Sequence, residues 1–571
     1  MNAHTPDTQW QRRLTWVTLG LCVAGAALGW RAFDLQVLDK TFLQARGDAR
    51  HLRVVPLPAH RGNIVDRQGD ILAASTPVDS IWVNPEDIDL ADPHWTQLAQ
   101  FLNLPLAQIH THVQTYHDRT FVYLRRHLAP DLKDRVMALK LAGVYAQREY
   151  RRFYPSGEIA TQVLGVTDVD DRGIEGLELS YDNILRGTPG AERVVKDLLG
   201  KAVERVELVR EANPGALLTL SIDHRIQYLA YRELKAAVLQ HHAQAGSAVV
   251  LDTQTGEVLA MVNLPAYNPN NRPEYRSMNA RNRAVTDVLE PGSTVKPFAV
   301  ITALTQHAYA PQTLIDTRPG SLQIGGRTIR DVHNYGVINV AQIIQKSSNV
   351  GIAKIALSLP KEALWQTYND AGLGRVTDSG FPGEASGRLP PHRLWHTIDQ
   401  ASLSFGYSMA VTPLQLAHAY VALANDGLAM PISFIKRNVP PEGFRVLDGA
   451  AVRTVRTMLE TVVEEDGTGV RARVPGYRIA GKTGTVRKVG VNGYMENKYL
   501  SLFAGFAPAS RPRLAMVVVV DEPTGVYYGG QVAAPVFSAV MAGALRMLDV
   551  PPDNAPSGPL KVAHLAGVAT P

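Results

Sequence analysis

The sequence predicts a mixed α/β protein with one membrane-spanning helix, a β-rich α+β module and a larger module built on an antiparallel sheet flanked by helices. Three observations predict this fold class. An uncharged apolar run fills residues 14–30, short β-rich runs broken by Gly and Asp follow from about residue 50, and a strand, helix and hairpin pattern begins near residue 214. A length of 571 residues also exceeds one ordinary domain.

The apolar run reads LTWVTLGLCVAGAALGW and lies between flanking arginines. As a helix it would span roughly 26 Å, slightly less than a hydrocarbon core of about 30 Å. A cleaved signal peptide is the alternative, because Ala24-Gly25-Ala26 resembles a cleavage site. Since the apolar run continues past that site, we favour a retained anchor with residues 1–13 in the cytoplasm and the rest translocated.

The remaining chain divides into four segments. Residues 31–49 are predicted as a juxtamembrane helix, 50–213 as a first module, 214–550 as a second module, and 551–571, with five prolines, as a mobile tail. Within the first module, residues 100–150 read as helices. Within the second, residues 224–242 read as an amphipathic helix and 247–262 as a hairpin around Thr255-Gly256.

Composition excludes several functions. Lys and Arg number 58 against 53 Asp and Glu, so a formal charge of +5 is spread thinly and provides no basic footprint for nucleic acid. The single cysteine, Cys22, excludes an intrachain disulfide, a CxxC redox pair and a multi-cysteine zinc site. A lone cysteine inside the membrane also suits an oxidising compartment.

Three short motifs indicate the chemistry: Ser293-Thr-Val-Lys296, Ser347-Ser348-Asn349 and Lys482-Thr483-Gly484. Each is weak alone, because a second S-x-x-K occurs at Ser358–Lys361 and a second S-x-N at Ser277–Asn279. Context separates them. Ser293 follows Pro-Gly and opens an apolar stretch, so it can begin a helix that places Lys296 on its own face. Lys361 instead follows a proline, which disrupts such a helix.

A serine hydroxyl needs a base before it acts as a nucleophile. A free lysine, with a pKa of about 10.4, is neutral in only about 0.04% of molecules at pH 7, a deficit of roughly 4.6 kcal/mol. Burial and a nearby cation lower a lysine pKa. We therefore expect Ser293 as nucleophile, Lys296 as its base and Lys482 as the neighbouring cation, provided that the fold brings them together.

The other motif residues suit supporting roles. Ser347 would relay a proton to a leaving amine, and Asn349 would hold the amide of an acyl donor. The backbone N–H groups of Ser293 and Thr485 would bind the oxyanion, where one donor is worth about 2.7–4 kcal/mol in other enzymes. Lys482 with the hydroxyls of Thr483 and Thr485 would bind a substrate carboxylate.

The motif triplet resembles the active-site signature of penicillin-recognising serine enzymes. The wider chain, roughly residues 14–550, is similar to the class B penicillin-binding proteins, and most of all to their division-specific septal members. This resemblance is specific because the matching segments occur in order: RGNIVDRQGDILA (61–73), YRRFYPSGEIATQVLG and GIEGLELSYDNILRG (within 150–187), EPGSTVKP, KSSNVG, VTPLQLA (411–417), AGKTGT and YYGGQVAAPVF (527–537).

The resemblance implies a penicillin-binding-protein/serine β-lactamase-like transpeptidase domain on a non-catalytic pedestal, the dimerisation domain. The activity would be D,D-transpeptidation of stem peptides ending in D-Ala-D-Ala, through a Ser293 acyl-enzyme that β-lactams also form. Expected partners are the lipid-linked precursor glycan, a membrane glycan polymerase and other divisome proteins. The expected location is the inner membrane at the septum, with the catalytic domain periplasmic. No cofactor or metal is expected.

The resemblance also places Tyr528 and Gly529 beside the pocket and Gly484 in the third motif. Two departures stand out: Ser408 and Val486 occupy positions where the family pattern has Gly and Ala. Since Val486 follows the expected oxyanion strand, it would tune the fit of drug or substrate.

Other functions remain open on sequence grounds. Residues 476–483 match the P-loop pattern G-x-x-x-x-G-K-[ST], and MVVVVD, ending at Asp521, resembles a Walker B strand. A P-loop must lead into a helix, however, and the Gly-rich, β-branched residues after Thr483 predict strands. A penicillin-fold sensor or scaffold, an elongation-type transpeptidase and a D,D-carboxypeptidase or β-lactamase are the further alternatives.

Overall fold

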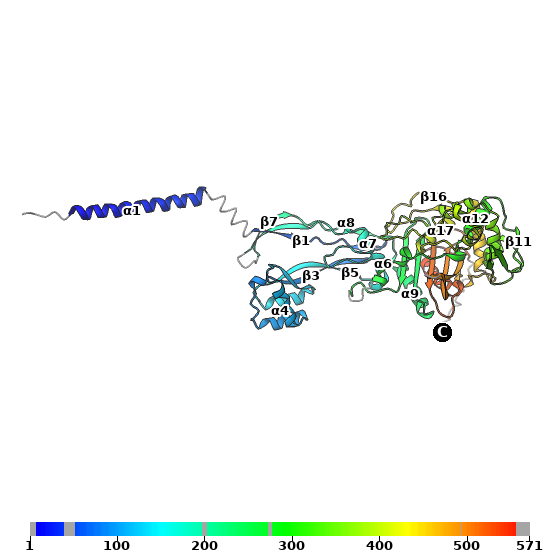
Figure 1. Cartoon of the computed structure of the whole chain (residues 1–571), viewed down its shortest axis with the longest axis horizontal. Helices are drawn as coiled ribbons and strands as arrows, with labels where there is room; N and C mark the ends of the chain where they lie inside the picture. The colour runs from blue at the N-terminus through cyan, green and yellow to red at the C-terminus, as the bar shows by residue number, and fades with distance from the viewer. Residues whose placement is uncertain (1–6, 39–51, 197–201, 272–276, 491–492, 555–571) are drawn as a thin grey trace, which may run out of the picture. The chain divides into compact units, whose positions relative to one another are not determined.

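The computed structural model describes residues 7–38, 52–196, 202–271, 277–490 and 493–554 (Figure 1). Their contacts divide the chain into two compact units made of interleaved segments. The first unit holds residues 1–60, 77–150 and 187–214, and the second holds 61–76, 151–186 and 215–571. Two segments of the expected pedestal, 61–76 and 151–186, therefore pack with the C-terminal part of the chain.

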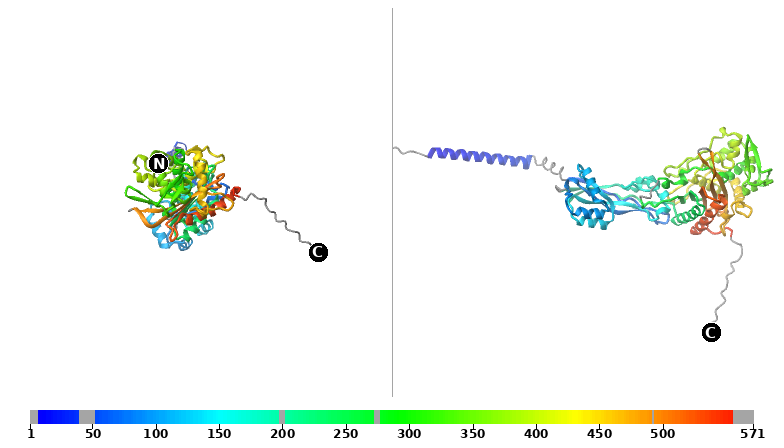
Figure 2. Two further views of the ribbon diagram at one scale, coloured as in Figure 1. Left: turned by 90° about the vertical axis from the view of Figure 1, so that its right-hand side faces the viewer. Right: turned by 60° about the horizontal axis from the view of Figure 1, so that its bottom comes forward.

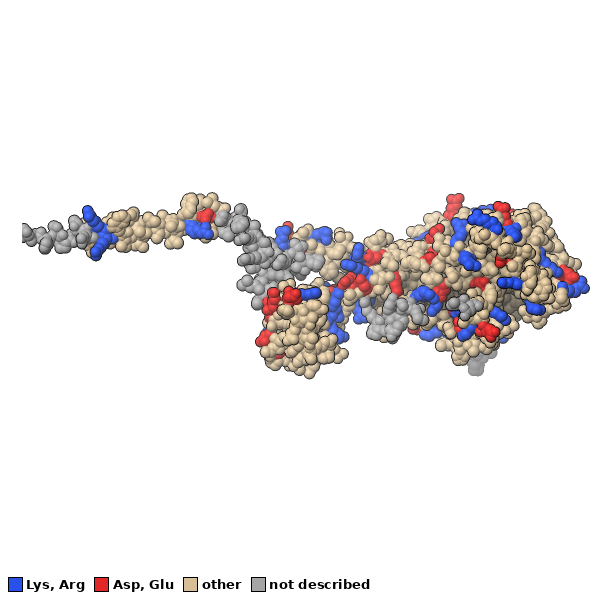
Figure 3. Space-filling view, in the orientation of Figure 1, with Lys and Arg blue, Asp and Glu red and all other residues tan. Residues whose placement is uncertain are grey.

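The N-terminal helix α1 (Asp7–Phe33) continues into a π-helical turn, Asp34–Leu38. Residues Trp10–Leu38 are long and apolar enough to cross a membrane, and none of the most apolar stretch is buried against protein. Figure 3 shows the middle of this helix free of charged side chains, with basic side chains toward both ends. Most of the expected juxtamembrane helix and nearly all of the expected C-terminal tail lie outside the described residues.

Two sheets organise the rest of the first unit. In one, β6 (Gly190–Lys196) lies antiparallel between β1 (Leu52–Leu57) and β7 (Ala202–Arg210). In the other, β3 pairs with β4 and β5, and three helices, α3, α4 and α5, pack against these strands. Their bounds are β3 (Ile71–Val83), β4 (Val122–Leu128), β5 (Val144–Phe153), α3 (His94–Leu102), α4 (Leu106–Thr115) and α5 (Pro130–Ala138).

The expectation that residues 100–150 are helical is therefore wrong for β4 and for the part of β5 within that range. Both strands bury apolar side chains against α3, α4 and α5, for example Val122, Leu128 and Val144. Charged residues such as Arg125 and Arg148 occupy the same strands, so their apolar pattern was too sparse to indicate strands without the helices that cover them.

The second unit is built on a five-stranded antiparallel sheet in the order β10-β9-β19-β18-β17. The strands are β9 (Ala245–Asp252), β10 (Val258–Leu264), β17 (Ala480–Gly490), β18 (Gly493–Ala507) and β19 (Leu514–Asp521). The predicted hairpin is confirmed as β9 and β10. Strands from the two ends of this unit thus lie side by side, and Figures 1 and 2 show its green and orange-red parts packed together.

Helices cover both faces of this sheet, as the sequence predicts. On one face α9 (His224–Gln240) and α19 (Gly529–Met547) pack on side chains such as Phe503 and Val518. On the other, α12 and α17 pack with Val249 and Val517. The helices and strands of that layer are α10 (Ser277–Ala280), α11 (Arg283–Thr286), α12 (Lys296–Thr305), β11 (Leu314–Asp316), β12 (Ser321–Ile324), β13 (Arg327–Arg330), β14 (Val337–Asn339), α13 (Val340–Lys346), α14 (Asn349–Leu357), α15 (Lys361–Asp370), α16 (Thr397–Leu403), α17 (Pro413–Ala424), β15 (Leu428–Ala429), β16 (Phe444–Arg445) and α18 (Gly449–Glu460).

A buried ionic cluster connects the segments 61–76 and 151–186. The elements of these segments are β2 (Ile64–Val65), α6 (Thr161–Leu164), α7 (Gly176–Ser180) and α8 (Asp182–Leu185), and β8 (Leu218–Thr219) pairs with β2. Arg61 and Arg152 both contact the carboxylate of Glu178, at 2.7 and 2.6 Å. All three side chains are buried. Because a buried charge is costly without a partner, these contacts fix how the two segments pack.

Candidate active site

Ser293 lies in a 3₁₀ turn, Gly292–Val295, that runs directly into α12. Gly292 has a φ of +56° and passes so close to β17 that a Cβ there would overlap Cγ2 of Val486. Glycine is therefore required for both reasons. The hydroxyl of Tyr420 donates to the carbonyl of Thr294 at 2.8 Å and anchors the turn from the core side. Ser293 is half-buried, and Lys296 follows one turn later, fully buried.

The Lys296 ammonium reaches the second motif. Its Nζ donates to Ser347 O at 2.6 Å, to Ser347 Oγ at 3.1 Å and to Asn349 Oδ1 at 2.8 Å. A neutral amine keeps a lone pair and two N–H donors, so this environment also suits the uncharged form. The first two motifs are thus joined through one nitrogen atom.

The second motif is a tight turn between two helices. Ser347 ends α13 with a φ of +63°, and Ser348 caps α14 by accepting from the N–H of Gly351 at 2.8 Å. The carboxylate of Asp331, just after β13, accepts from Ser348 Oγ at 2.6 Å and from the N–H groups of Asn349 and Val350. The acid therefore sits at the N-terminus of α14, where the helix dipole favours it.

The third motif lies within β17. Lys482 is fully buried, and among the described residues its Nζ makes one hydrogen bond, to Thr483 O at 3.3 Å. The hydroxyl of Thr483 is 2.8 Å from that of Thr468, and Thr485 Oγ1 accepts from the N–H of Gly529 at 3.0 Å. Thr468 and Gly529 thus contact β17 at Thr483 and Thr485, the two residues whose hydroxyls we expect to bind substrate.

Burial governs the electrostatics of the two lysines. Burial, reinforced by the neighbouring Lys482 cation, holds the pKa of Lys296 well below its ordinary value, while Asp331 acts in the opposite sense. Burial also lowers the pKa of Lys482 to about 7. Because each charge disfavours the other, an uncharged Lys296 is accessible near neutral pH. The predicted base is therefore in an environment that allows it to accept a proton.

A cavity of about 840 Å³ opens over these groups. Six of the predicted site residues line it: Ser293, Ser347, Asn349, Thr483, Thr485 and Tyr528. Lys296 and Lys482 lie buried behind this surface. Gly484 and Gly529 do not line it; instead each is a close-packing position, since a Cβ on Gly529 would overlap the carbonyl oxygen of Gly484.

Two residues of the site were not found from sequence. Asp331 and Thr468 each contact a motif, but neither has a recognisable local pattern. Glu290 accepts from the N–H of Ser408 at 2.8 Å, and Ser408 has a φ of +65°. The family glycine at position 408 would suit that backbone without strain.

The P-loop interpretation is wrong. Residues 476–490, all of them described, lead into β17 and not into a helix N-terminus. Lys482 is buried within the strand, and Asp521 pairs with Lys488 at 2.8 Å. The second S-x-x-K is also separate from the site, because Nζ of Lys361 donates to the carbonyl of Trp395.

Comparison with known proteins agrees with this geometry. Residues 246–542 match the penicillin-binding protein transpeptidase domain, and residues 56–220 match the penicillin-binding protein dimerisation domain. Peptidoglycan D,D-transpeptidase FtsI of Escherichia coli K12 is 44% identical over 555 residues, 95% of this chain and 94% of the relative. Probable peptidoglycan D,D-transpeptidase PbpC of Pseudomonas aeruginosa is 42% identical over 538 residues, 94% of this chain and 95% of the relative.

Solved structures show the same fold. The apo transpeptidase domain of penicillin-binding protein 3 from Burkholderia pseudomallei is 48% identical, with a TM-score of 0.54, and covers 58% of this chain and 97% of its own. Penicillin-binding protein 3 from Mycobacterium tuberculosis, solved with aztreonam, is 29% identical, with a TM-score of 0.68, and covers 87% of this chain and 98% of its own. With both domains matched in order and one relative similar over nearly its whole length, this chain belongs to the class B penicillin-binding proteins.

Proposed function

We propose that this protein is a peptidoglycan D,D-transpeptidase that cross-links stem peptides at the division septum and that β-lactams acylate at Ser293. The activity follows from membership of the family and from the transpeptidase names of its relatives. The observation that carries the site assignment is the position of Lys296 Nζ, buried one turn from Ser293 and bonded to Ser347 and Asn349.

In the first step, Ser293 Oγ attacks the carbonyl of the penultimate D-Ala and passes its proton to neutral Lys296. The N–H groups of Ser293 and Thr485 hold the oxyanion. Ser347 relays the proton to the nitrogen of the terminal D-Ala, the peptide bond breaks and an ester to Ser293 forms. Lys482, with the hydroxyls of Thr483 and Thr485, holds the terminal carboxylate, and Asn349 holds the donor amide.

In the second step, an amine from a neighbouring stem attacks the ester carbonyl. The amine loses a proton to the same base, the ester bond breaks, and Ser293 regains its hydrogen. The balance is one new amide bond and one released D-Ala. The reaction involves no redox change.

The location is that of an inner-membrane division protein, in agreement with the match to FtsI and with the apolar helix at Trp10–Leu38. We further propose that residues 1–13 are cytoplasmic and that the transpeptidase unit is periplasmic. A membrane glycan polymerase and other divisome proteins would be its partners, and lipid-linked precursor would supply the stems. The lone cysteine within the apolar helix supports a location in an oxidising compartment.

Acylation by a labelled penicillin tests the site. We expect stoichiometric labelling of the intact protein and none of Ser293→Ala, with Ser277→Ala, from the second S-x-N, as the matched control. Unchanged labelling of Ser293→Ala would exclude this nucleophile.

Cross-linked muropeptides, formed from lipid-linked precursor in the presence of a polymerase, test the reaction type. Released D-Ala without cross-links would support a carboxypeptidase instead. Acylation with neither product would support a sensor.

A further inference from the structure

A smaller cavity, of about 260 Å³, is lined by residues of α9 and α19, and we call it the α9–α19 cavity. Two of its lining residues, Arg471 and Gln531, also line the active-site cavity. Arg471 belongs to a 3₁₀ turn, Val470–Ala472, that packs on α19, and Gln531 lies in the first turn of α19 itself. The two cavities therefore lie against the same pair of residues, which we call the junction.

The junction lies close to Thr483. The hydroxyl of Thr468 is 2.8 Å from that of Thr483. A Cβ on Gly530 would lie 2.1 Å from the carbonyl oxygen of Thr468 and 3.5 Å from Cγ2 of Thr483. Arg471 follows Thr468 by three residues, and Gln531 follows Gly530 directly. Both residues of the junction are therefore held next to the hydroxyl that we expect to bind the terminal carboxylate of the donor.

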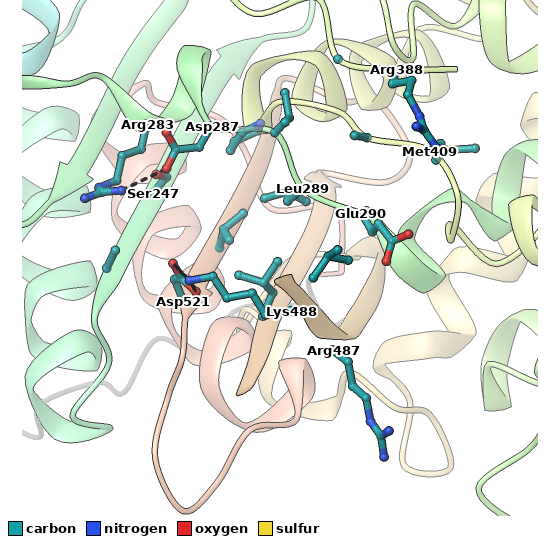
Figure 4. A pocket seen from close by; sticks show the side chains of 18 of the residues that line it. Ser247, Arg283, Asp287, Leu289, Glu290, Arg388, Met409, Arg487, Lys488 and Asp521 are labelled. Atoms are coloured by element: carbon teal, nitrogen blue, oxygen red, sulfur yellow. Dashed lines mark hydrogen bonds and ion pairs between the residues drawn. The ribbon is translucent and has the colours of Figure 1, made fainter. Parts of the chain in front are cut away.

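The donor peptide leads away from this junction. In the proposed reaction its terminal residue lies at Thr483 and its attacked carbonyl at the N–H of Thr485, so its upstream residues run toward Arg487 and Lys488. Figure 4 shows that end of β17, where Lys488 points toward Asp521, its partner at 2.8 Å. The junction instead lies beside the terminal residue, the one that leaves in the first step.

The second step needs the place that this leaving residue vacates. The attacking amine bonds to the same carbonyl carbon from which the D-Ala nitrogen has departed, so it approaches through that place. Because the donor fills the cleft on one side of the carbonyl, the rest of the acceptor extends to the other, past Thr483 toward Arg471 and Gln531. The acceptor is itself a stem peptide and therefore carries at least one carboxylate, at its own C-terminus.

The acids around the junction are already paired. Among the described residues, Asp466 is the acid that lines the active-site cavity and Glu233 the acid that lines the α9–α19 cavity. Asp466 lies 3.8 Å from Lys346, and Glu233 lies 2.6 Å from Arg232. Neither carboxylate therefore leaves a net negative charge that would repel an anionic ligand from the junction.

Arg471 is the cation placed for the acceptor carboxylate, since a guanidinium binds carboxylates well. Its side chain is exposed and makes no hydrogen bond or ion pair within the described part of the chain. Burial and the charge of Arg471 both lower the pKa of His241, which puts the guanidinium near this lining residue of the α9–α19 cavity. Arg330 and Arg487 also line the active-site cavity, but Arg487 lies on the donor side and the carbonyl of Arg330 accepts from Asn349 of the second motif.

We propose that the α9–α19 cavity is the acceptor subsite, and that Arg471, with the amide of Gln531, binds a carboxylate of the acceptor stem while its amine reaches the Ser293 ester. The inference rests on the proposed function, because it starts from the direction of the donor at Ser293. It extends that function by naming a feature that the enzyme selects in the acceptor, a negative charge. Formation of the acyl-enzyme does not use this subsite.

The test uses the full-length protein, a saturating donor pentapeptide with its amines acetylated, and two acceptors: a stem peptide with free carboxylates and the same peptide with its carboxylates amidated. For Arg471→Ala we expect KM for the free acceptor to rise about 10-fold at an unchanged maximal rate, and KM for the amidated acceptor to change less than 2-fold. Released D-Ala should rise relative to cross-linked product, because water then competes better for the ester. Penicillin acylation should keep its original rate, and Arg471→Lys should restore part of the loss.

Arg473→Ala is the matched control, because Arg473 is exposed two residues further on but lines neither cavity. Arg330→Ala tests the charge of the active-site cavity as a whole. An equal rise in KM for both acceptors, no rise for the free acceptor, slower penicillin acylation or the same rise in Arg330→Ala would each overturn the acceptor subsite. These outcomes are distinguishable from failure of the proposed function, since in that case the parent protein would form no acyl-enzyme at Ser293 or no cross-link.

Discussion

At the scale of one residue, the buried amine of Lys482 lowers the free energy of unfolding. It is fully buried, its one hydrogen bond within the part of the chain that the structure describes is 3.3 Å long, and burial lowers its pKa to about 7. In the unfolded chain the same amine has a pKa of about 10.4. The unfolded state therefore binds more protons between these values, and this group makes the free energy of unfolding rise with pH from about 7 to about 10.

We predict that Lys482→Met stabilises the protein at pH 7 by on the order of 2 kcal/mol, because the variant no longer buries an amine. The same variant should lose penicillin acylation. Thermal unfolding with and without labelled penicillin measures both effects, and Lys436→Met, at an exposed position, is the control. A lower unfolding midpoint for Lys482→Met would contradict this account of the site.

Asp331 acts on the site through the second motif. Its carboxylate holds the hydroxyl of Ser348 and the first N–H groups of α14, and this turn places Ser347 and Asn349 on Lys296. We predict that Asp331→Asn slows penicillin acylation at least 10-fold, because removing a charged acceptor leaves buried donors poorly paired, at about 1–3 kcal/mol. Asp316→Asn, at an exposed aspartate of β11, should acylate at the normal rate. Equal acylation rates for the two variants would show that the S-x-N turn keeps its conformation without the Asp331 carboxylate.

At the scale of elements, the ionic cluster around Glu178 joins two chain segments. It also contains an acid, Asp171, whose carboxylate is only partly hydrogen-bonded among the described residues. Asp171 accepts from the hydroxyl of Ser75 at 3.0 Å, and its other carboxylate oxygen is buried with no hydrogen-bond partner among the described residues. The charges of Arg152 and Arg61 lower the pKa of Asp171, and the charge of Glu178 raises it. Burial outweighs the two arginines and raises the pKa of Asp171 to about 6.

A raised carboxyl pKa means that the folded state holds its proton more tightly than the unfolded state. The free energy of unfolding contributed by Asp171 therefore falls as the pH rises from about 4 to about 6. We predict that Asp171→Asn removes this fall and leaves the protein more stable than the parent at pH 7. Urea unfolding at pH 4.5 and pH 7 measures the difference, with exposed Asp70→Asn as the control. If the free energy of unfolding of Asp171→Asn depended on pH as that of the parent does, the titrating group would be a residue other than Asp171.

At the scale of the whole molecule, the apolar helix α1 belongs to the first of the two compact units and contains the one cysteine of the sequence, Cys22. If this helix crosses the membrane, a membrane-impermeant maleimide should label Cys22 in detergent but not in intact inner membranes. In a Cys22→Ala background, Ser510→Cys, exposed in the transpeptidase unit, should label in intact spheroplasts. Labelling of Ser510→Cys only after lysis would reverse the proposed topology.

Much of this molecule could be read from local pattern. The apolar run, helix α9 and the β9–β10 hairpin each depend on periodicity within a short window, and the structure contains all three. The sequence did not predict β4 and β5, because their charged residues hide the alternation and their apolar side chains are buried only when α3, α4 and α5 pack against them. The nucleophile turn, the S-x-N turn and the lysine strand were found because each carries its chemistry within three or four residues.

The sequence by itself determined the residue types expected for serine acyl transfer, their order and an apolar helix long enough to cross a membrane, since these depend on composition and spacing over a few residues. Only the tertiary structure decided that Lys296 loses affinity for its proton and that Asp331 supports the S-x-N turn. Each of these properties arises from burial and from distances between segments far apart along the chain. Neither quantity is present in local sequence, because folding creates both.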